Sequence, residues 1–145
     1  MIGLLQRVSQ ASVEVDSQII AAIDTGLLVF IGVEKDDTQT RANRLLERLL
    51  GYRVFPDAGG RMNLSLIDIH GGLLLVPQFT LTADTNKGMR ASLSSAAPPE
   101  LGRALFDHLL QQARAAYTVV AAGGFGADMQ VHLINDGPVT FWLRT

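Results

Sequence analysis

Runs of apolar residues, separated by glycines and turn-forming residues, predict a chain rich in short β-strands. Ile2–Val8 is apolar, Ser12–Val15 alternates apolar and polar positions, and apolar character resumes at Ile19–Ile23 after the polar Asp16–Gln18. This is the pattern of a strand followed by a hairpin. Gly26–Val33 is apolar without interruption and bounded by glycine, which is typical of a strand buried on both faces. We expect that strand to be central in its sheet.

Two segments have the spacing of amphipathic helices. The first follows acidic and hydroxyl residues at Glu34–Thr38, which suit a helix start, and stops at Gly51. The second opens at Pro98-Pro99-Glu100, where proline is compatible with a first helical turn. Their apolar stripes are Ala42, Leu45, Leu46, Leu49 and Leu50 in the first helix, and Leu101, Leu105, Leu109 and Ala113 in the second. Both helices should pack on the sheet.

Shorter apolar runs complete the predicted elements. The further strands expected are Tyr52–Phe55, Met62–Leu66, Leu73–Leu81, Met129–Leu133 and Val139–Leu143. The polar stretch Ala83–Ser95 has no period and predicts a long surface loop. About eight strands and two helices that do not alternate as βαβ units indicate the α+β class. We therefore predict a single domain over residues 1–145, with an antiparallel or mixed barrel-like sheet and the two main helices on one side.

Composition narrows the function. The 145 residues are 48% apolar and 18% charged, which is ample material for a core without disulfides, and there is no cysteine. The absence of cysteine, of a signal-peptide pattern and of an apolar run of about 20 residues predicts a cytoplasmic protein without a membrane segment. The net charge of −2 argues against binding that depends on many phosphate contacts, so we expect any nucleic-acid contact to be local.

Polar groups in two otherwise apolar segments indicate a site. Leu73–Thr85 reads LLLVPQFTLTADT, and Asn135–Trp142 reads NDGPVTFW. An amide, a hydroxyl and a Gly-Pro peptide do not improve a hydrophobic core, so each requires a hydrogen-bond partner or a ligand.

Two common kinds of catalytic centre are disfavoured. His70, His108 and His132 lie on a predicted turn, helix and strand without metal-ligand spacing, so we expect neither a metal site nor a catalytic triad. The serines of the long loop lack the GxSxG pattern of a serine hydrolase.

The segments QRVSQASV, GLLVFIGVEKDD, QFTLTADTNKGMRASLSSAAPP and FGADMQVHLINDGPVTFW, in this order, resemble the D-aminoacyl-tRNA deacylase family, also called D-tyrosyl-tRNA deacylase. The resemblance runs from Met1 to Trp142. It implies a cytosolic homodimer that hydrolyses the ester between a D-amino acid and the 3′-terminal ribose of tRNA, and that also removes glycine mischarged on tRNA(Ala). It implies a role in translation quality control, and neither a metal nor an organic cofactor.

The resemblance also implies catalytic roles for Gln78, Phe79 and Thr80. In the family, the first motif reads Ser-Gln-Phe-Thr, whereas this chain has Pro77 in the first position. Proline lacks both the side-chain hydroxyl and the amide hydrogen, and it favours the end or edge of a strand. The amides of Phe79 and Thr80 remain as oxyanion donors, so we expect activity to be retained, at an unchanged or reduced rate.

Further substrate contacts follow from the same resemblance. Gly137 and Pro138 correspond to a Gly-cisPro element that reaches into the partner subunit's site and rejects L-aminoacyl groups. Arg7 would brace that element by donating to carbonyls. Phe125 and Met129 would lie near the terminal adenosine and the aminoacyl group. The candidates for phosphate contacts are Lys87 and Arg90.

Without the resemblance, each residue has a plainer interpretation. Gln78 and Thr80 would be strand residues facing solvent, and Gly137-Pro138 would be an ordinary turn. Arg7, Lys87 and Arg90 would be solvated surface side chains, and Phe125 and Met129 would be core residues. A second functional hypothesis also stands: a non-catalytic dimeric module that binds RNA ends, with activity weakened by Pro77.

Overall fold

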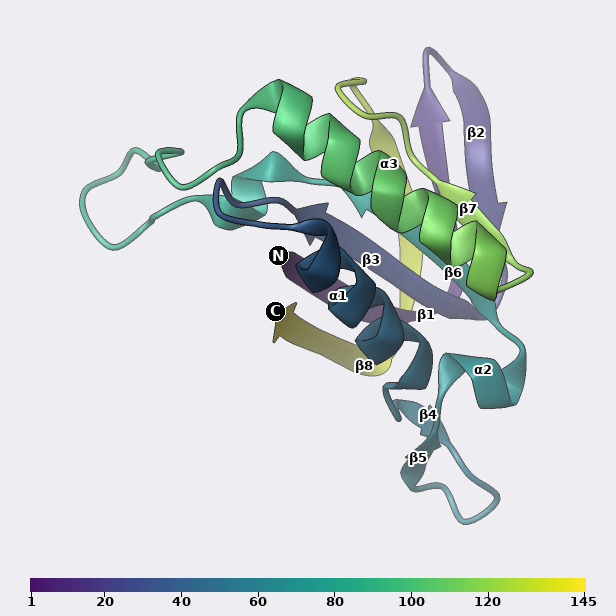
Figure 1. The fold of residues 1–145 in the computed structure, drawn as a ribbon. Coiled ribbons are helices and arrows are strands. Elements are labelled where there is room, and N and C mark those ends of the chain that lie inside the picture. Colours follow the sequence, from purple (N-terminus) through teal and green to yellow (C-terminus); the bar gives the residue numbers. More distant parts are fainter.

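The computed structural model describes all 145 residues and contains one main β-sheet with two long helices on the same side (Figure 1). The strands are β1 (Ile2–Val15), β2 (Gln18–Ile23), β3 (Gly26–Gly32), β4 (Phe55–Pro56), β5 (Met62–Leu64), β6 (Gly72–Pro77), β7 (Val120–Ala122) and β8 (Gln130–Arg144). The helices are α1 (Gln39–Gly51), α2 (Leu66–Ile69) and α3 (Pro99–Ala116), with a 3₁₀ turn η1 (Phe79–Thr82). The α+β class, the barrel-like sheet and the placement of the two main helices are confirmed.

The long strand β1 organises the sheet. It pairs antiparallel with β3 through its first half, with β2 through its second half, and with β8 along the opposite edge. β3 then pairs parallel with β6, and β6 pairs parallel with β7. The order β2-β1-β3-β6-β7 places β3 in the interior of the sheet, as its uninterrupted apolar run predicts.

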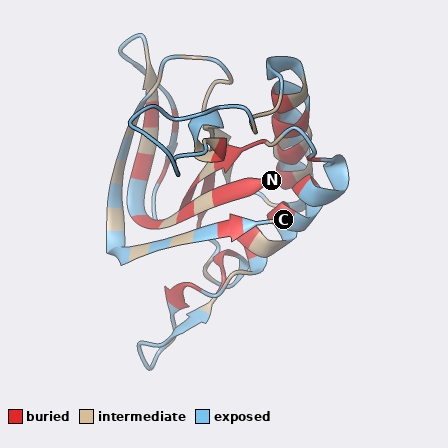
Figure 2. Cartoon of the chain, turned by 90° about the vertical axis from the view of Figure 1, so that its left-hand side faces the viewer, coloured by how far each residue is buried: buried red, intermediate tan, exposed pale blue.

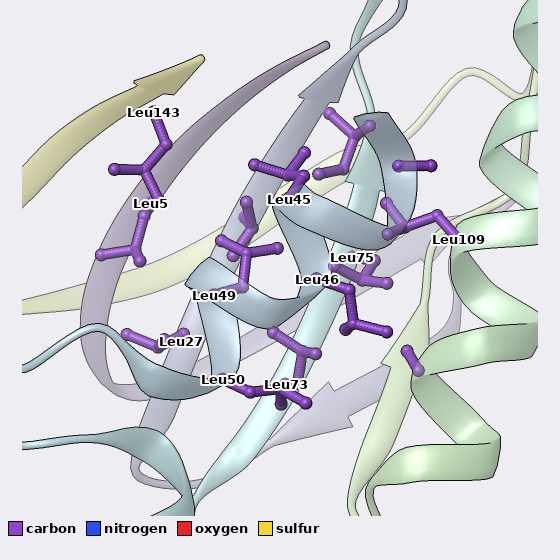
Figure 3. Close-up of a cluster of buried hydrophobic side chains, with 14 of the residues drawn as sticks. Leu5, Leu27, Leu45, Leu46, Leu49, Leu50, Leu73, Leu75, Leu109 and Leu143 are labelled. Atoms are coloured by element: carbon purple, nitrogen blue, oxygen red, sulfur yellow. The ribbon is translucent and has the colours of Figure 1, made fainter. Parts of the chain in front are cut away.

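Alternate residues of the central strands pack on opposite faces of the sheet. Leu27 and Val29 of β3 join the larger cluster beneath the helices, whereas Leu28 joins a smaller cluster on the other face with Val8 and Val13. Figure 3 shows leucines from β1, β3, β6, β8, α1 and α3 meeting in the larger cluster. Burial of one such side chain contributes about 1.5–3 kcal/mol, so this interface fixes the helices on the sheet.

Local chemistry explains where several boundaries differ from the sequence expectation. The expected strand Leu73–Leu81 is wrong beyond Pro77, where β6 ends and η1 begins. The expected strand Met62–Leu66 ends at Leu64, because Ser65 caps α2 and forms a capping box with Asp68.

Two more expectations are corrected. The strand expected at Tyr52–Phe55 is the two-residue β4, Phe55–Pro56. The two strands expected at Met129–Leu133 and Val139–Leu143 form one strand, β8, with an irregularity between them. The sequence did not indicate β7, α2 or the continuity of β1 through Ser9 and Gln10.

Candidate active site

A cleft of about 530 Å³ opens at the carboxyl ends of the parallel strands β3 and β6. The start of α3 and the segment Phe125–Met129 close its other sides. Ligands of sheets with parallel strands commonly bind outside the carboxyl ends of those strands. The lining is mainly apolar, with Gln78 and Asp128 among its few polar side chains, and such a composition is typical of a small-molecule site.

The turn that follows β6 supplies one wall of the cleft. Pro77 is the last residue of β6, opposite Ile31, and the Gln78 amide still donates to the Ile31 carbonyl at 2.8 Å. Pro77, Gln78 and Phe79 line the cleft, and the residue Phe79 is 61% exposed. Proline therefore ends the pairing of β6 just where the chain turns into η1.

The amides of Phe79 and Thr80 begin η1. The backbone hydrogen bonds of this 3₁₀ turn begin at Leu81, whose amide donates to the Gln78 carbonyl at 3.2 Å. The Ala83 amide then donates to the Thr80 carbonyl. The first amides of a helical turn have no acceptor inside that turn. The Thr80 hydroxyl does not line the cleft, but it accepts a hydrogen bond from the Gln78 side-chain amide.

Phe125 and Met129 are both cleft residues and core residues. The Phe125 ring lies 6.3 Å from the Phe106 ring between centroids and packs on the larger cluster, whereas Met129 packs on the smaller one. Both side chains line the cleft. The plainer interpretation as core residues is therefore correct in part, and the contact of both residues with a substrate stays a prediction.

Gly137-Pro138 lies on β8, outside the set of residues that line the cleft of its own chain. The peptide bond between the two residues is cis. The pairing of β8 with β1 shifts register here. The Asn135 side chain bridges the irregular segment, because its oxygen accepts a hydrogen bond from the Val139 amide at 2.7 Å. Gly137 and Pro138 are both exposed to solvent. We call the segment Asn135–Val139 the β8 bulge.

Arg7 supports the β8 bulge from beneath, so its interpretation as a surface side chain is wrong. It is 9% exposed, and its Nε donates to the Asp136 carbonyl at 2.9 Å while Nη1 donates to the Val54 carbonyl at 2.6 Å. An ion pair with the Asp136 carboxylate, at 3.2 Å, adds to these contacts. The donation to a carbonyl expected of Arg7 is present, on the residue before Gly137.

Lys87 and Arg90 lie in the long loop that extends away from the sheet in Figure 1. Both side chains are exposed and form no ion pair, and the neighbouring Met89 is fully exposed. The loop is closed at its base by a bridge between Asp84 and Ser92, whose amides and carbonyls exchange hydrogen bonds. These two cations are not part of the cleft.

The sequence did not indicate that the start of α3 would form part of the site. Ala97, Pro99 and Gly102 line the cleft, and a Cβ added to Gly102 would lie 3.3 Å from the Phe125 ring. A glycine inside a helix costs stability and often marks a close approach, so Gly102 was the available signal.

No group of three His, Cys, Asp or Glu side chains is arranged to hold a metal ion. None of the helices is both long and apolar enough to cross a membrane.

Comparison with known proteins agrees with the resemblance seen in the sequence. Residues 4–144 match the family model described as D-Tyr-tRNA(Tyr) deacylase. The D-aminoacyl-tRNA deacylase of Thioalkalivibrio sulfidiphilus (strain HL-EbGR7) is 65% identical over 144 residues, which cover 99% of this chain and 97% of that protein. The protein of the same name from Pseudomonas syringae pv. tomato (strain ATCC BAA-871 / DC3000) is 63% identical over 145 residues, and both chains are covered completely.

Solved structures show the same fold. The c-Myc DNA unwinding element binding protein superposes with a TM-score of 0.96 at 37% identity and covers 100% of this chain and 99% of its own. A probable eukaryotic D-amino acid tRNA deacylase superposes with a TM-score of 0.86 at 19% identity, covering 99% and 98% of the two chains, which supports the fold alone. On the full-length family match and these identities, the chain belongs to the D-Tyr-tRNA(Tyr) deacylase family.

Proposed function

We propose that this D-aminoacyl-tRNA deacylase hydrolyses its substrate in the cleft, with Gly137-Pro138 supplied by a second copy of the chain. One observation carries the proposal. Gln78 and Phe79 line the cleft, whereas the exposed Gly137-Pro138 of the same chain does not, which supports a site in which the two family motifs would meet across subunits. The substrate would be the aminoacylated 3′ end of tRNA, met in the cytoplasm.

The chemistry proposed is direct hydrolysis of an ester. Water attacks the carbonyl carbon, the bond to the ribose oxygen breaks, and a proton passes to that oxygen, which leaves tRNA and a free D-amino acid. The amides of Phe79 and Thr80 would donate to the oxyanion that forms during attack, and one such donor commonly contributes about 2.7–4 kcal/mol. No side-chain nucleophile is required.

Gln78 and Thr80 would complete the catalytic set. Their side chains are joined by the hydrogen bond from the Gln78 amide to the Thr80 hydroxyl, which holds both at the end of β6. The Thr80 hydroxyl keeps its own hydrogen to donate to the ester or to the attacking water. Because Gln78 is half-buried on the cleft wall, its orientation also shapes the site.

Selection between mirror images would come from backbone groups of the partner's β8 bulge. Carbonyls fixed on one side of the pocket would accept from the α-ammonium of a D-residue, and their bulk would turn away an L side chain. Rejecting the abundant substrate by a clash does not require recognition of each side chain, so the site would accept many D-residues. Glycine has no side chain to clash, so glycine mischarged on tRNA(Ala) would also be removed.

The substrate's RNA would be held at two places. Phe125 and Met129 would form the apolar wall against the terminal adenosine and the aminoacyl group, because stacking on an aromatic ring holds an unpaired base. Lys87 and Arg90 would contact phosphates farther along the tRNA, since their charges are exposed and unpaired.

A chirality assay tests the proposal. Purified protein should remove D-tyrosine from D-tyrosyl-tRNA and leave L-tyrosyl-tRNA intact. The Pro77→Ser variant, which restores the family's hydroxyl, should cleave the same enantiomer at an equal or higher rate. If excess wild-type protein cleaves neither substrate but binds tRNA ends, the chain is the non-catalytic RNA-end-binding module instead. Restored cleavage by Pro77→Ser in that case would assign the loss of activity to proline.

A further inference from the structure

The Phe125 wall of the cleft is held in place from the second turn of α3. Gly102 leaves space for the Phe125 ring, since a Cβ there would come within 3.3 Å of it. One residue farther along, the Arg103 guanidinium carbon lies 4.8 Å from the centroid of the same ring, and Nη2 donates to the Phe125 carbonyl at 3.2 Å. Arg103 therefore holds both the ring and the backbone of this wall.

Arg103 also brings an uncompensated positive charge to the edge of the cleft. No carboxylate lies within 4 Å of its guanidinium, and its side chain is exposed. Of all the arginine and lysine side chains, it alone is hydrogen-bonded to a residue of the cleft lining. A guanidinium carries five N–H donors, and this one uses a single donor on the protein.

The backbone beside Arg103 leaves room for a ligand. Gly126 lines the cleft, is exposed and has no side chain, and a Cβ built on it would lie 3.9 Å from the Arg103 Nη2 atom. Its φ of +78° is one that residues with side chains rarely adopt, so this opening is maintained by glycine. A group bound at the Phe125 wall can thus extend past Gly126 towards the free donors of Arg103.

We propose that Arg103 is an anion-binding residue of the substrate site, which takes the phosphate on the 5′ side of the nucleoside held at Phe125. This inference rests on the proposed function, because it assumes that a nucleoside occupies the cleft. Arginine matches the planar arrangement of phosphate oxygens and remains charged at all relevant pH values. Asp128 is the carboxylate of the cleft lining, so Arg103 is also the group that offsets its repulsion of a phosphate.

Binding of adenosine and of adenosine 5′-monophosphate, measured by calorimetry at low salt, tests the inference without depending on catalysis. Wild-type protein should prefer the monophosphate by about tenfold, as expected for one charge-assisted hydrogen bond to phosphate. Arg103→Met keeps the aliphatic stem and should lose this preference, because it should weaken binding of the monophosphate about tenfold more than binding of adenosine. Arg103→Lys keeps the charge and should retain part of the preference.

Arg114→Met is the matched control, because Arg114 is an exposed arginine on the same helix and does not line the cleft. It should leave both affinities unchanged. The inference is overturned if Arg103→Met retains the preference for the monophosphate, or if it weakens both ligands equally, which would restrict Arg103 to holding Phe125. Wild-type protein that cleaves D-tyrosyl-tRNA but does not prefer the monophosphate would also overturn it, and would leave the proposed function standing.

Discussion

At the scale of single residues, Phe79 in the turn after β6 has a backbone amide and a side-chain ring with different roles. Phe79 is largely exposed, so its ring contributes little to the core, whereas its amide begins η1 at the cleft. Substitutions can therefore remove the amide hydrogen or the ring independently.

Phe79→Pro removes the amide hydrogen and should lower kcat on D-tyrosyl-tRNA by about 10²–10³-fold, the usual loss for one oxyanion donor. Phe79→Ala removes the ring and keeps the amide, so it should retain most of kcat. Single-turnover rates of the two variants show whether the amide or the ring of Phe79 contributes to catalysis. Equal loss in both variants would assign the contribution to the ring.

Thr80→Ala removes the hydroxyl that is paired with Gln78. We expect kcat to fall by about two- to tenfold, the range for one net hydrogen bond, and Thr80→Ser to restore it. Unchanged turnover in Thr80→Ala would leave the reaction to backbone groups alone. Melting temperatures of both variants check that the exposed position does not affect folding.

Gly137 occupies a position that does not tolerate a side chain. Its φ is +133°, and a Cβ would lie 2.7 Å from the Val139 side chain and 2.9 Å from Arg7 Nη2. Gly137→Ala should therefore displace the β8 bulge and reduce D-aminoacyl-tRNA cleavage more than tenfold, because positioned groups lose their effect when moved by about 1 Å.

Gly51→Ala provides the control for Gly137→Ala. A Cβ at Gly51, the last residue of α1, meets nothing within 4 Å. This variant should keep wild-type activity and have at least wild-type stability in the same assays. Wild-type cleavage by Gly137→Ala would show that the bulge does not take part in the site.

At the scale of elements, Tyr117 joins the end of α3 to the turn between α2 and β6. Its hydroxyl donates to the Gly71 carbonyl at 2.6 Å and lies 3.2 Å from the Leu66 carbonyl. Burial raises the pKa of the Tyr117 hydroxyl above its usual value of 10.0. Tyr117→Phe should cost about 1 kcal/mol of unfolding free energy near neutral pH, the net value of one hydrogen bond.

The contribution of Tyr117 should depend on pH in alkaline solution. Because the pKa is higher in the folded state, the unfolded chain loses the proton first, so this contribution is complete below pH 10 and decreases as pH rises through the folded-state pKa. Urea unfolding at pH 8 and pH 11 should show a smaller difference between wild type and Tyr117→Phe at the higher pH. A constant difference would contradict the assignment.

Helices and strands with a strong local pattern of apolar residues could be predicted from the sequence. The apolar run of β3 and the stripe that ends at Gly51 indicated a central strand and α1 directly. Pro77 indicated the end of a strand, but the apolar residues beyond it continued the strand pattern although the chain turns into η1. Alternation cannot reveal such a turn, since it depends on hydrogen bonds to Ile31 and within the turn.

The same reasoning explains what the sequence indicated about the site. Gln78, Phe125 and Met129 line one cleft, and Gln78 was visible in the sequence as a polar residue at the end of an apolar run. Arg103 carried no signal, because one exposed arginine on a helix resembles any other until the fold places it beside Phe125.

At the scale of the whole molecule, β8 is the outer strand beside β1 and presents a mostly exposed face that ends near the C terminus in Figure 2. The β8 bulge interrupts it, away from the cleft. The proposed site made of both parts would therefore need a second copy, and a two-fold dimer would contain two such sites.

Mixing two defective variants distinguishes a shared site from one within a chain. Phe79→Pro is defective in the cleft and Gly137→Ala in the bulge, so their heterodimer has one intact composite site. After unfolding and refolding in equal amounts, random pairing should restore about a quarter of wild-type activity. No activity above the separate variants would place both parts in the same chain, and light scattering should show dimers in all samples.

The β8 bulge has one more consequence, for solubility during folding. A long outer strand exposes a row of backbone donors and acceptors on which strands from other chains can stack into fibrous aggregates. The register shifts beside Val8 on β1 mark where the β8 bulge makes this strand irregular, and Pro138 within the bulge has no amide hydrogen to offer. The β8 bulge, which the proposed site uses for selection, thus also divides an aggregation-prone strand edge into two short lengths.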